Sequence, residues 1–160
     1  MTNITVRRSR KEDFQALMEI DQFIWNETNT PAVTIFETVE KYEKHFPEGS
    51  QFVAISNGEI CGYIGYKSPI PIPSNSHVVE IDMGVHPDFK RQGVGTALIA
   101  FVENWAKENK KRKLSLRVLS TNPGAISFYR ANGFKEQGRL VGEFLINGKL
   151  VDDILMYKLL

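Results

Sequence analysis

The sequence has a single cysteine, almost no net charge and no long apolar run. With Cys61 alone among 160 residues, no internal disulfide can form. The formal net charge of +1 provides no overall field that would favour nucleic acid or an anionic membrane. No apolar run approaches the roughly 20 residues of a membrane span, and residues 1–10 lack the apolar core of a signal peptide. We therefore expect a cytoplasmic protein with no nucleic-acid or membrane partner.

The sequence also gives little support for a metal site or a catalytic thiol. The three histidines share no metal-ligand spacing with the cysteine or with one another, so we expect no metal site. Cys61 lies inside the apolar stretch 60–66, which favours a packed side chain over a nucleophile. By contrast, 42% of the residues are apolar, and the length is that of one ordinary domain. The sequence therefore predicts one domain over residues 1–160.

The most informative segment is residues 78–105, VVEIDMGVHPDFKRQGVGTALIAFVENW. Its first eight residues are β-prone, and Pro87 ends that strand because proline removes a ladder donor. The second half repeats apolar residues at the spacing of a core-facing helix. Between them lie a basic turn and two glycines, Gly93 and Gly95. The first turn of a helix presents unpaired N–H groups at the positive end of its dipole, so this turn predicts a phosphate-binding site.

Two common nucleotide-binding motifs do not fit this turn. A P-loop requires a lysine and a serine or threonine just after its second glycine, but Gly95 is followed by Thr96 and an alanine. The dinucleotide fingerprint requires a third small residue where Leu98 stands, and an acidic residue at the end of the next strand, which reads Val-Leu-Ser.

The residues resemble instead the signature Q/R-x-x-G-x-G/A of the GNAT acetyltransferase family, which here runs from Lys90 to Gly95. A second stretch, residues 122–134, is similar to the family pattern N-x-x-A-x-x-F-Y-x-x-x-G-F. The resemblance covers nearly the whole chain and is weakest in the first fifty residues. It departs from the pattern at Lys90, where glutamine or arginine is typical.

The remaining sequence predicts an α/β (α+β) fold of about seven strands and about four helices. Asn-Gly pairs at 57–58 and 147–148 predict hairpins that join strands 52–56 to 59–66 and 140–146 to 150–159. Strands are also expected at 4–8, 78–85 and 113–119. Helices are expected after a capping box of Ser9 with Glu12, over 36–46, from Gly93 onward and over 123–131, the last capped by Asn122. A crossover helix makes the fourth and fifth strands parallel in a mixed, mostly antiparallel sheet. The resemblance implies the GNAT fold, in which these two strands splay apart.

The resemblance also implies acetyl-CoA as co-substrate. Its pyrophosphate would be held by the turn, and its pantetheine arm would bond the main chain of the fourth strand in the manner of an added strand. Asn122 has a second interpretation as a helix cap, and it can serve both roles. The cofactor-binding residues implied are Met83, Gly84, Val85, Lys90, Arg91, Gln92, Gly93, Val94, Gly95, Thr96, Asn122 and Tyr129.

Transfer of an acetyl group to an amine also needs an acid and a base. Tyr129 lies where the family commonly has a tyrosine facing the coenzyme sulfur, so it is the candidate acid. The alternative is that Tyr129 belongs only to the apolar face of a short helix. Glu80 is the candidate base and Asp82 the second choice, because residues two apart share one strand face. The alternative for both is that they steer a cationic substrate without taking its proton.

Three functions remain open from the sequence. The first is an N-acetyltransferase of a small primary amine, such as an amino acid, a polyamine or an antibiotic, which attacks acetyl-CoA directly in a ternary complex. The second is acetylation of a protein N-terminus or lysine. The third is a non-catalytic acyl-CoA sensor, which would not require Tyr129. The long apolar hairpin near the C-terminus makes a homodimer plausible by the same resemblance.

Overall fold

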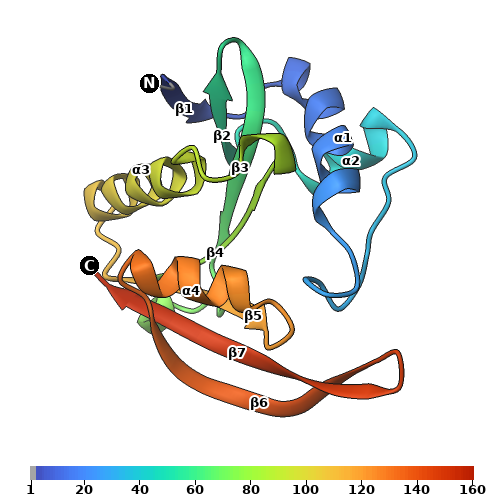
Figure 1. The fold of residues 1–160 in the computed structure, drawn as a ribbon. Helices are drawn as coiled ribbons and strands as arrows, with labels where there is room; N and C mark the ends of the chain where they lie inside the picture. Colours follow the sequence, from blue (N-terminus) through green and yellow to red (C-terminus); the bar gives the residue numbers. More distant parts are fainter. Residues whose placement is uncertain (1–2) are drawn as a thin grey trace. The chain divides into compact units, whose positions relative to one another are not determined.

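The computed structural model describes residues 3–160, in which strands and helices follow one another in the order that the sequence predicts (Figure 1). The elements are β1 (Ile4–Arg8), α1 (Phe14–Ile24), α2 (Val39–His45), β2 (Gln51–Ser56), β3 (Glu59–Lys67), β4 (Val78–Val85), α3 (Val94–Glu108), β5 (Lys113–Leu119), α4 (Pro123–Ala131), β6 (Lys135–Ile146) and β7 (Lys149–Leu159). The strands hydrogen-bond in the order β1-β2-β3-β4-β5-β7-β6. The predicted mixed sheet is confirmed.

The parallel pair of this sheet is β4 with β5, joined by the crossover through α3. The ladder between them joins Val78, Val79 and Glu80 to Lys113, Leu114 and Ser115, which are the first three residues of each strand. β1 with β2, β2 with β3, β5 with β7 and β6 with β7 pair antiparallel. The parallel ladder is therefore confined to one end of β4, as a splay of these strands requires.

The chain forms two compact units, which we describe separately. The first unit contains the chain up to Ile24 together with Thr34–Tyr66 and Asp82–Trp105. The second unit contains Trp25–Val33, Lys67–Ile81 and Ala106–Leu160. The single-domain organisation expected from the length stays a prediction.

The core of the first unit lies between its helices and the β2–β3 hairpin. At Asn57 and Gly58, φ is 51° and 78°, which is the left-handed pair that a type I′ turn needs. Helix α1 buries one face, because its apolar residues recur three and four positions apart. The fully buried side chains include Phe14, Leu17, Tyr42, Phe52, Val53, Ile64 and Leu98.

The second unit is built on the β5–β7–β6 ladder. The predicted face of β5, formed by Leu114, Leu116 and Val118, is buried. β6 and β7 run side by side as a long hairpin (Figure 1). This hairpin is longer than predicted, since β6 begins at Lys135 rather than at residue 140. Residues 135–139 are largely polar and show no clear alternation, so their sequence does not indicate a strand. They are strand-like because their main chain pairs with β7.

The predicted start of the first helix is wrong. The Ser9 hydroxyl does not cap it, because that oxygen accepts a hydrogen bond from the Gly49 N–H at 3.1 Å. The chain instead forms a short 3-10 turn, in which the Asp13 carboxylate accepts from the Arg10 N–H at 2.7 Å. The second predicted helix is also shorter than expected, because the Thr38 side chain accepts from the Lys41 N–H and begins it there.

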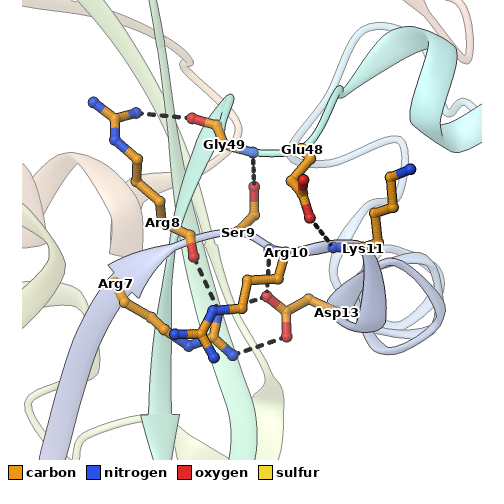
Figure 2. A network of polar contacts seen from close by, with 8 residues as sticks. All are labelled: Arg7, Arg8, Ser9, Arg10, Lys11, Asp13, Glu48 and Gly49. Atoms are coloured by element: carbon orange, nitrogen blue, oxygen red, sulfur yellow. Dashed lines mark hydrogen bonds and ion pairs between the residues drawn. The ribbon is translucent and has the colours of Figure 1, made fainter.

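Asp13 is the centre of this polar network (Figure 2). Its two carboxylate oxygens accept from the two terminal nitrogens of Arg7, at 2.7 and 3.0 Å. Burial alone would raise the pKa of Asp13, but the hydrogen bonds from Arg7 and from the Arg10 N–H hold that pKa below its ordinary value. The pair therefore keeps Asp13 ionised at the start of α1.

Replacing Asp13 with asparagine is expected to lower the free energy of unfolding at pH 7 by about 1 to 3 kcal/mol, because Arg7 then loses its partner. A carboxyl whose pKa is depressed on folding stabilises the protein above its unfolded pKa and loses that contribution as the pH falls through its folded pKa. The difference between wild type and variant should therefore start to shrink below about pH 4 and vanish only once the pH has fallen below the folded pKa of Asp13. Denaturant unfolding at a series of pH values measures this. Exposed Glu108, changed to glutamine, is the control, and an equal pH dependence in both variants would contradict the assignment.

Candidate functional site

The turn between β4 and α3 adopts a backbone that only certain residues tolerate. After the 3-10 helix Pro87–Phe89, the Lys90 N–H donates to the Pro87 carbonyl at 3.3 Å. Arg91 and Gly93 then take left-handed φ values of 63° and 82°. A Cβ built on Gly93 would meet no atom within 4 Å, so the surface above that residue is open. The glycine thus serves the backbone conformation and leaves room for a close ligand.

Helix α3 begins directly after this turn. Its first intrahelical bond runs from the Ala97 N–H to the Gly93 carbonyl at 2.9 Å. The N–H groups of Val94, Gly95 and Thr96 therefore belong to the first turn, where α-helix geometry supplies no intrahelical acceptor. Val94 and Gly95 are buried while Thr96 is exposed. Main-chain donors and the positive end of the helix dipole thus coincide at one place.

The side chains of the turn add positive charge around these donors. Lys90 and Arg91 are both exposed. Gln92 is exposed as well, and its Nε2 donates to the Asp88 carbonyl at 3.3 Å, which ties the turn to the preceding 3-10 helix. The turn therefore has the main-chain donors and the positive charges that the predicted anion-binding site requires.

Neighbouring elements pack closely against Gly84 near the end of β4. A Cβ on Gly84 would lie 2.8 Å from Ile24 Cδ1 and 3.2 Å from Tyr63 Cε1. A Cβ on Gly62 of β3 would lie 2.9 Å from the Gly84 carbonyl oxygen. Met83 and Val85 are half-buried and, by the strand period, project to the face opposite Gly84. Gly84 is required here because α1 and β3 leave no space for a side chain.

Two carboxylates lie on the Gly84 side of the first unit. The Tyr63 hydroxyl donates to Asp21 Oδ1 at 2.7 Å, and the Tyr63 ring is buried. Asp82 Oδ1 lies 2.6 Å from the point where a Cβ on Gly65 would stand, so that glycine makes room for the carboxylate. Burial raises the pKa of Tyr42, and the charge of Asp21 and then that of Asp82 raise it further. The charges of both carboxylates are therefore felt at the Tyr42 hydroxyl.

Sequence reasoning missed Asp21 and Tyr63. They are 42 positions apart, and neither stands in a local motif. The one available signal was that Tyr63 sits in a strand rich in glycine, where close approach of another element is expected.

Glu80, the candidate base, lies in the second unit. Its carboxylate pairs with Lys67 Nζ at 3.2 Å, and the two side chains are 22% and 70% exposed. Sequence reasoning missed this partner too, because it comes from the end of the preceding strand. The pair holds the partly accessible Glu80 carboxylate beside a positive charge.

Asn122 and Tyr129 also lie in the second unit. Asn122 Oδ1 accepts from the Ala125 N–H at 3.3 Å, so its predicted role as a helix cap is confirmed. The Tyr129 ring packs against Phe128 and Phe134, with centroid separations of 5.4 and 5.7 Å. Tyr129 is 9% exposed. Tyr129 thus lies on the apolar face of α4, and the two phenylalanines hold its ring in one orientation.

Cys61 has the structural role that the sequence predicts. It is fully buried, and its Sγ donates to the Ala54 carbonyl oxygen at 3.4 Å. Burial raises the pKa of its thiol, so the nucleophilic thiolate is disfavoured. Within residues 3–160, no group of three or more His, Cys, Asp or Glu side chains is arranged to hold a metal ion. None of the helices in this described part of the chain is long and apolar enough to cross a membrane.

Comparison with known proteins identifies the family. A family model described as the Acetyltransferase (GNAT) family matches residues 13–134. The chain therefore belongs to the GNAT acetyltransferase family, and it is an acyltransferase that uses acetyl-CoA as co-substrate.

Two relatives indicate the range of named activities. The chain is 26% identical to the L-amino acid N-acetyltransferase AaaT of Escherichia coli, with 98% of each chain covered. It is 28% identical to a spermidine N(1)-acetyltransferase of Vibrio cholerae, with 79% of this chain and 74% of the relative covered.

Two solved structures share the fold. The protein smu.2055 from Streptococcus mutans superposes with a TM-score of 0.87 at 28% identity, over 96% of this chain and 97% of that one. A phosphinothricin acetyltransferase from Sinorhizobium meliloti, solved in complex with AcCoA, superposes with a TM-score of 0.85 over 98% of this chain and 88% of that one. At 21% identity the latter shows the fold alone. The predicted GNAT fold is confirmed.

Proposed function

We propose that this chain acetylates the primary amine of a small molecule by direct attack of the amine on acetyl-CoA in a ternary complex. The observation that carries the proposal is the glycine turn, where the first-turn N–H groups of α3 and two exposed cations surround the open surface at Gly93. The names of the relatives supply the substrate class, since they act on L-amino acids and on spermidine.

The turn from Lys90 to Thr96 holds the pyrophosphate in this proposal. The main chain of Met83, Gly84 and Val85 bonds the pantetheine arm, because β4 leaves its ladder with β5 after Glu80 and its remaining main-chain groups require partners. An N–H near Val85 then polarises the thioester carbonyl. Asn122 contributes to coenzyme binding in addition to capping α4.

Tyr129 serves as the acid that protonates the departing thiolate, supported by its match to the family pattern and by a ring held between two phenylalanines. Glu80 serves as the base, acting on the ammonium through a water. Its carboxylate is partly accessible and is positioned by the ion pair with Lys67, which supports this role. Asp82 remains the second choice for this role.

Replacing Glu80 with glutamine is expected to lower kcat/KM for the amine by about a hundredfold at pH 7, the usual scale of a lost general base. The loss should shrink as the pH approaches the pKa of the amine, which then deprotonates without help. The control is Lys67→Gln, which keeps the carboxylate and should change kcat/KM little. A loss that is constant across pH, or no loss, would remove Glu80 from this role.

The experiment that tests the function is a thiol-release assay with acetyl-CoA over amines, amino acids and peptide N-termini. Release with small amines or amino acids supports the proposal. Release with peptides alone would favour a protein acetyltransferase, and binding of acetyl-CoA without release for any acceptor would favour a sensor. The homodimer and the cytoplasmic location expected from the sequence stay predictions; light scattering tests the first and cell fractionation the second.

A further inference from the structure

The first unit contains a cavity of about 500 Å³ that the proposed reaction does not use. Its walls come from three segments: the chain from Arg7 into α1, the tip of the β2–β3 hairpin, and the 3-10 helix Pro87–Phe89 with His86 before it. This volume falls within the range of small-molecule sites, roughly 300 to 1,000 Å³. We call it the hairpin groove.

The charges around the hairpin groove are strongly unbalanced. Arg7 and Asp13 line it, but they neutralise each other through the two-point contact drawn in Figure 2. His86 Nδ1 accepts from the Asp88 N–H at 3.1 Å and lies 3.9 Å from the Asp88 carboxylate. Four further carboxylates line the groove, and all are exposed: Glu12, Glu19, Glu59 and Asp88. In a chain with a net charge of only +1, this is a local concentration of negative charge.

The walls between these carboxylates are apolar. Ile20, Ile55 and Ile60 contribute aliphatic surface. Phe23 is 66% exposed, and its ring centroid lies 5.4 Å from that of His86, which in turn lies 5.8 Å from that of Phe89. An exposed phenylalanine beside a cavity is available to a ligand with an apolar surface of its own.

These features select one ligand chemistry. The carboxylates do not converge on a point, since no trio of acidic side chains in the described chain could hold a metal ion. They are distributed around apolar walls, which suits separate cationic groups joined by a hydrocarbon chain. We propose that the hairpin groove is a second binding site, distinct from the acetyl-transfer site, for a linear aliphatic diamine or polyamine. Its methylenes would lie on the isoleucines and Phe23, and its ammonium groups would pair with the surrounding carboxylates.

The test uses 1,8-diaminooctane as the probe, titrated into the whole protein at low ionic strength by calorimetry without acetyl-CoA. Saturable binding is expected, weakened severalfold by 0.3 M salt because the carboxylates are exposed. The neutral analogue 1,8-octanediol should bind at least about tenfold more weakly, since exposed ion pairs contribute up to about fivefold each. Equal binding of the two probes would overturn the proposal.

Variants locate the bound probe. The double variant Glu12→Gln with Glu59→Gln should weaken binding of the diamine about tenfold, and Phe23→Ser should weaken it severalfold by removing apolar surface. The matched control is Glu80→Gln, which alters the proposed acetyl-transfer site and should leave this binding unchanged. Turnover of the double variant should match wild type, so failure here is distinguishable from failure of the proposed function. Binding sensitive to Glu80 but not to Glu12 and Glu59 would overturn the proposal, as would concentration-dependent self-association of the protein that the double variant abolishes.

Discussion

Replacing Gly93 with aspartate is expected to weaken acetyl-CoA binding by at least about a hundredfold. The new carboxylate would stand at the amino end of α3, where the proposal places the pyrophosphate. At a separation of about 4 Å near a protein surface, two unit negative charges repel by about 4 kcal/mol, and a hundredfold loss of affinity corresponds to about 2.7 kcal/mol. Calorimetry with acetyl-CoA measures the change directly.

The same substitution at Gly148 provides a matched control. Gly148 has φ of 76°, close to the 82° of Gly93, and a Cβ at either position would meet no atom within 4 Å. Both variants therefore carry the same backbone cost, on the order of 1 kcal/mol. If both bind acetyl-CoA equally, the turn before α3 is not the coenzyme site, whatever the chain's family.

Replacing Tyr129 with phenylalanine is expected to lower kcat about a hundredfold while the affinity for acetyl-CoA stays within about threefold, the pattern of a lost general acid. The ring contacts with Phe128 and Phe134 survive this change, because only the hydroxyl is removed. Single-turnover and steady-state rates, with coenzyme binding by calorimetry, separate the two quantities.

The pH profile sharpens the test of Tyr129. An acid must be protonated to act, so the wild-type rate should fall at high pH and the variant should lack that limb. Tyr157→Phe is the control, since the Tyr157 ring lies beside Lys113 and belongs to neither the proposed coenzyme site nor the proposed acid–base pair. An unchanged kcat in Tyr129→Phe would return Tyr129 to a purely packing role.

Elements with a strong local pattern could be predicted from the sequence. Strand β4 has the predicted bounds, because proline-rich sequence precedes it and Pro87 follows it. The turn at Asn57-Gly58 is also as predicted, since two consecutive left-handed residues need that chemistry. The start of α1 was missed because the Ser9 hydroxyl is engaged by the Gly49 N–H, 40 positions away in the chain, and Asp13 forms the local cap instead.

The candidate site likewise contains features that the sequence predicts and features that it does not. The glycine turn could be predicted, because its backbone conformation is encoded by consecutive residues. The bond from Tyr63 to Asp21 and the ion pair of Glu80 with Lys67 could not, since each joins different elements. The hairpin groove could not be predicted either, because its walls come from three separate segments.

The close packing of Ile24 on Gly84 fixes the spacing between α1 and β4. With Ile24 Cδ1 only 2.8 Å from the position of a Cβ on Gly84, α1 cannot approach β4 by even the width of a methyl group. A larger residue at position 84 would therefore require a smaller side chain at position 24 or an outward shift of the end of α1. At Gly84 the strand has no space for a side chain as long as Ile24 and Tyr63 keep their positions.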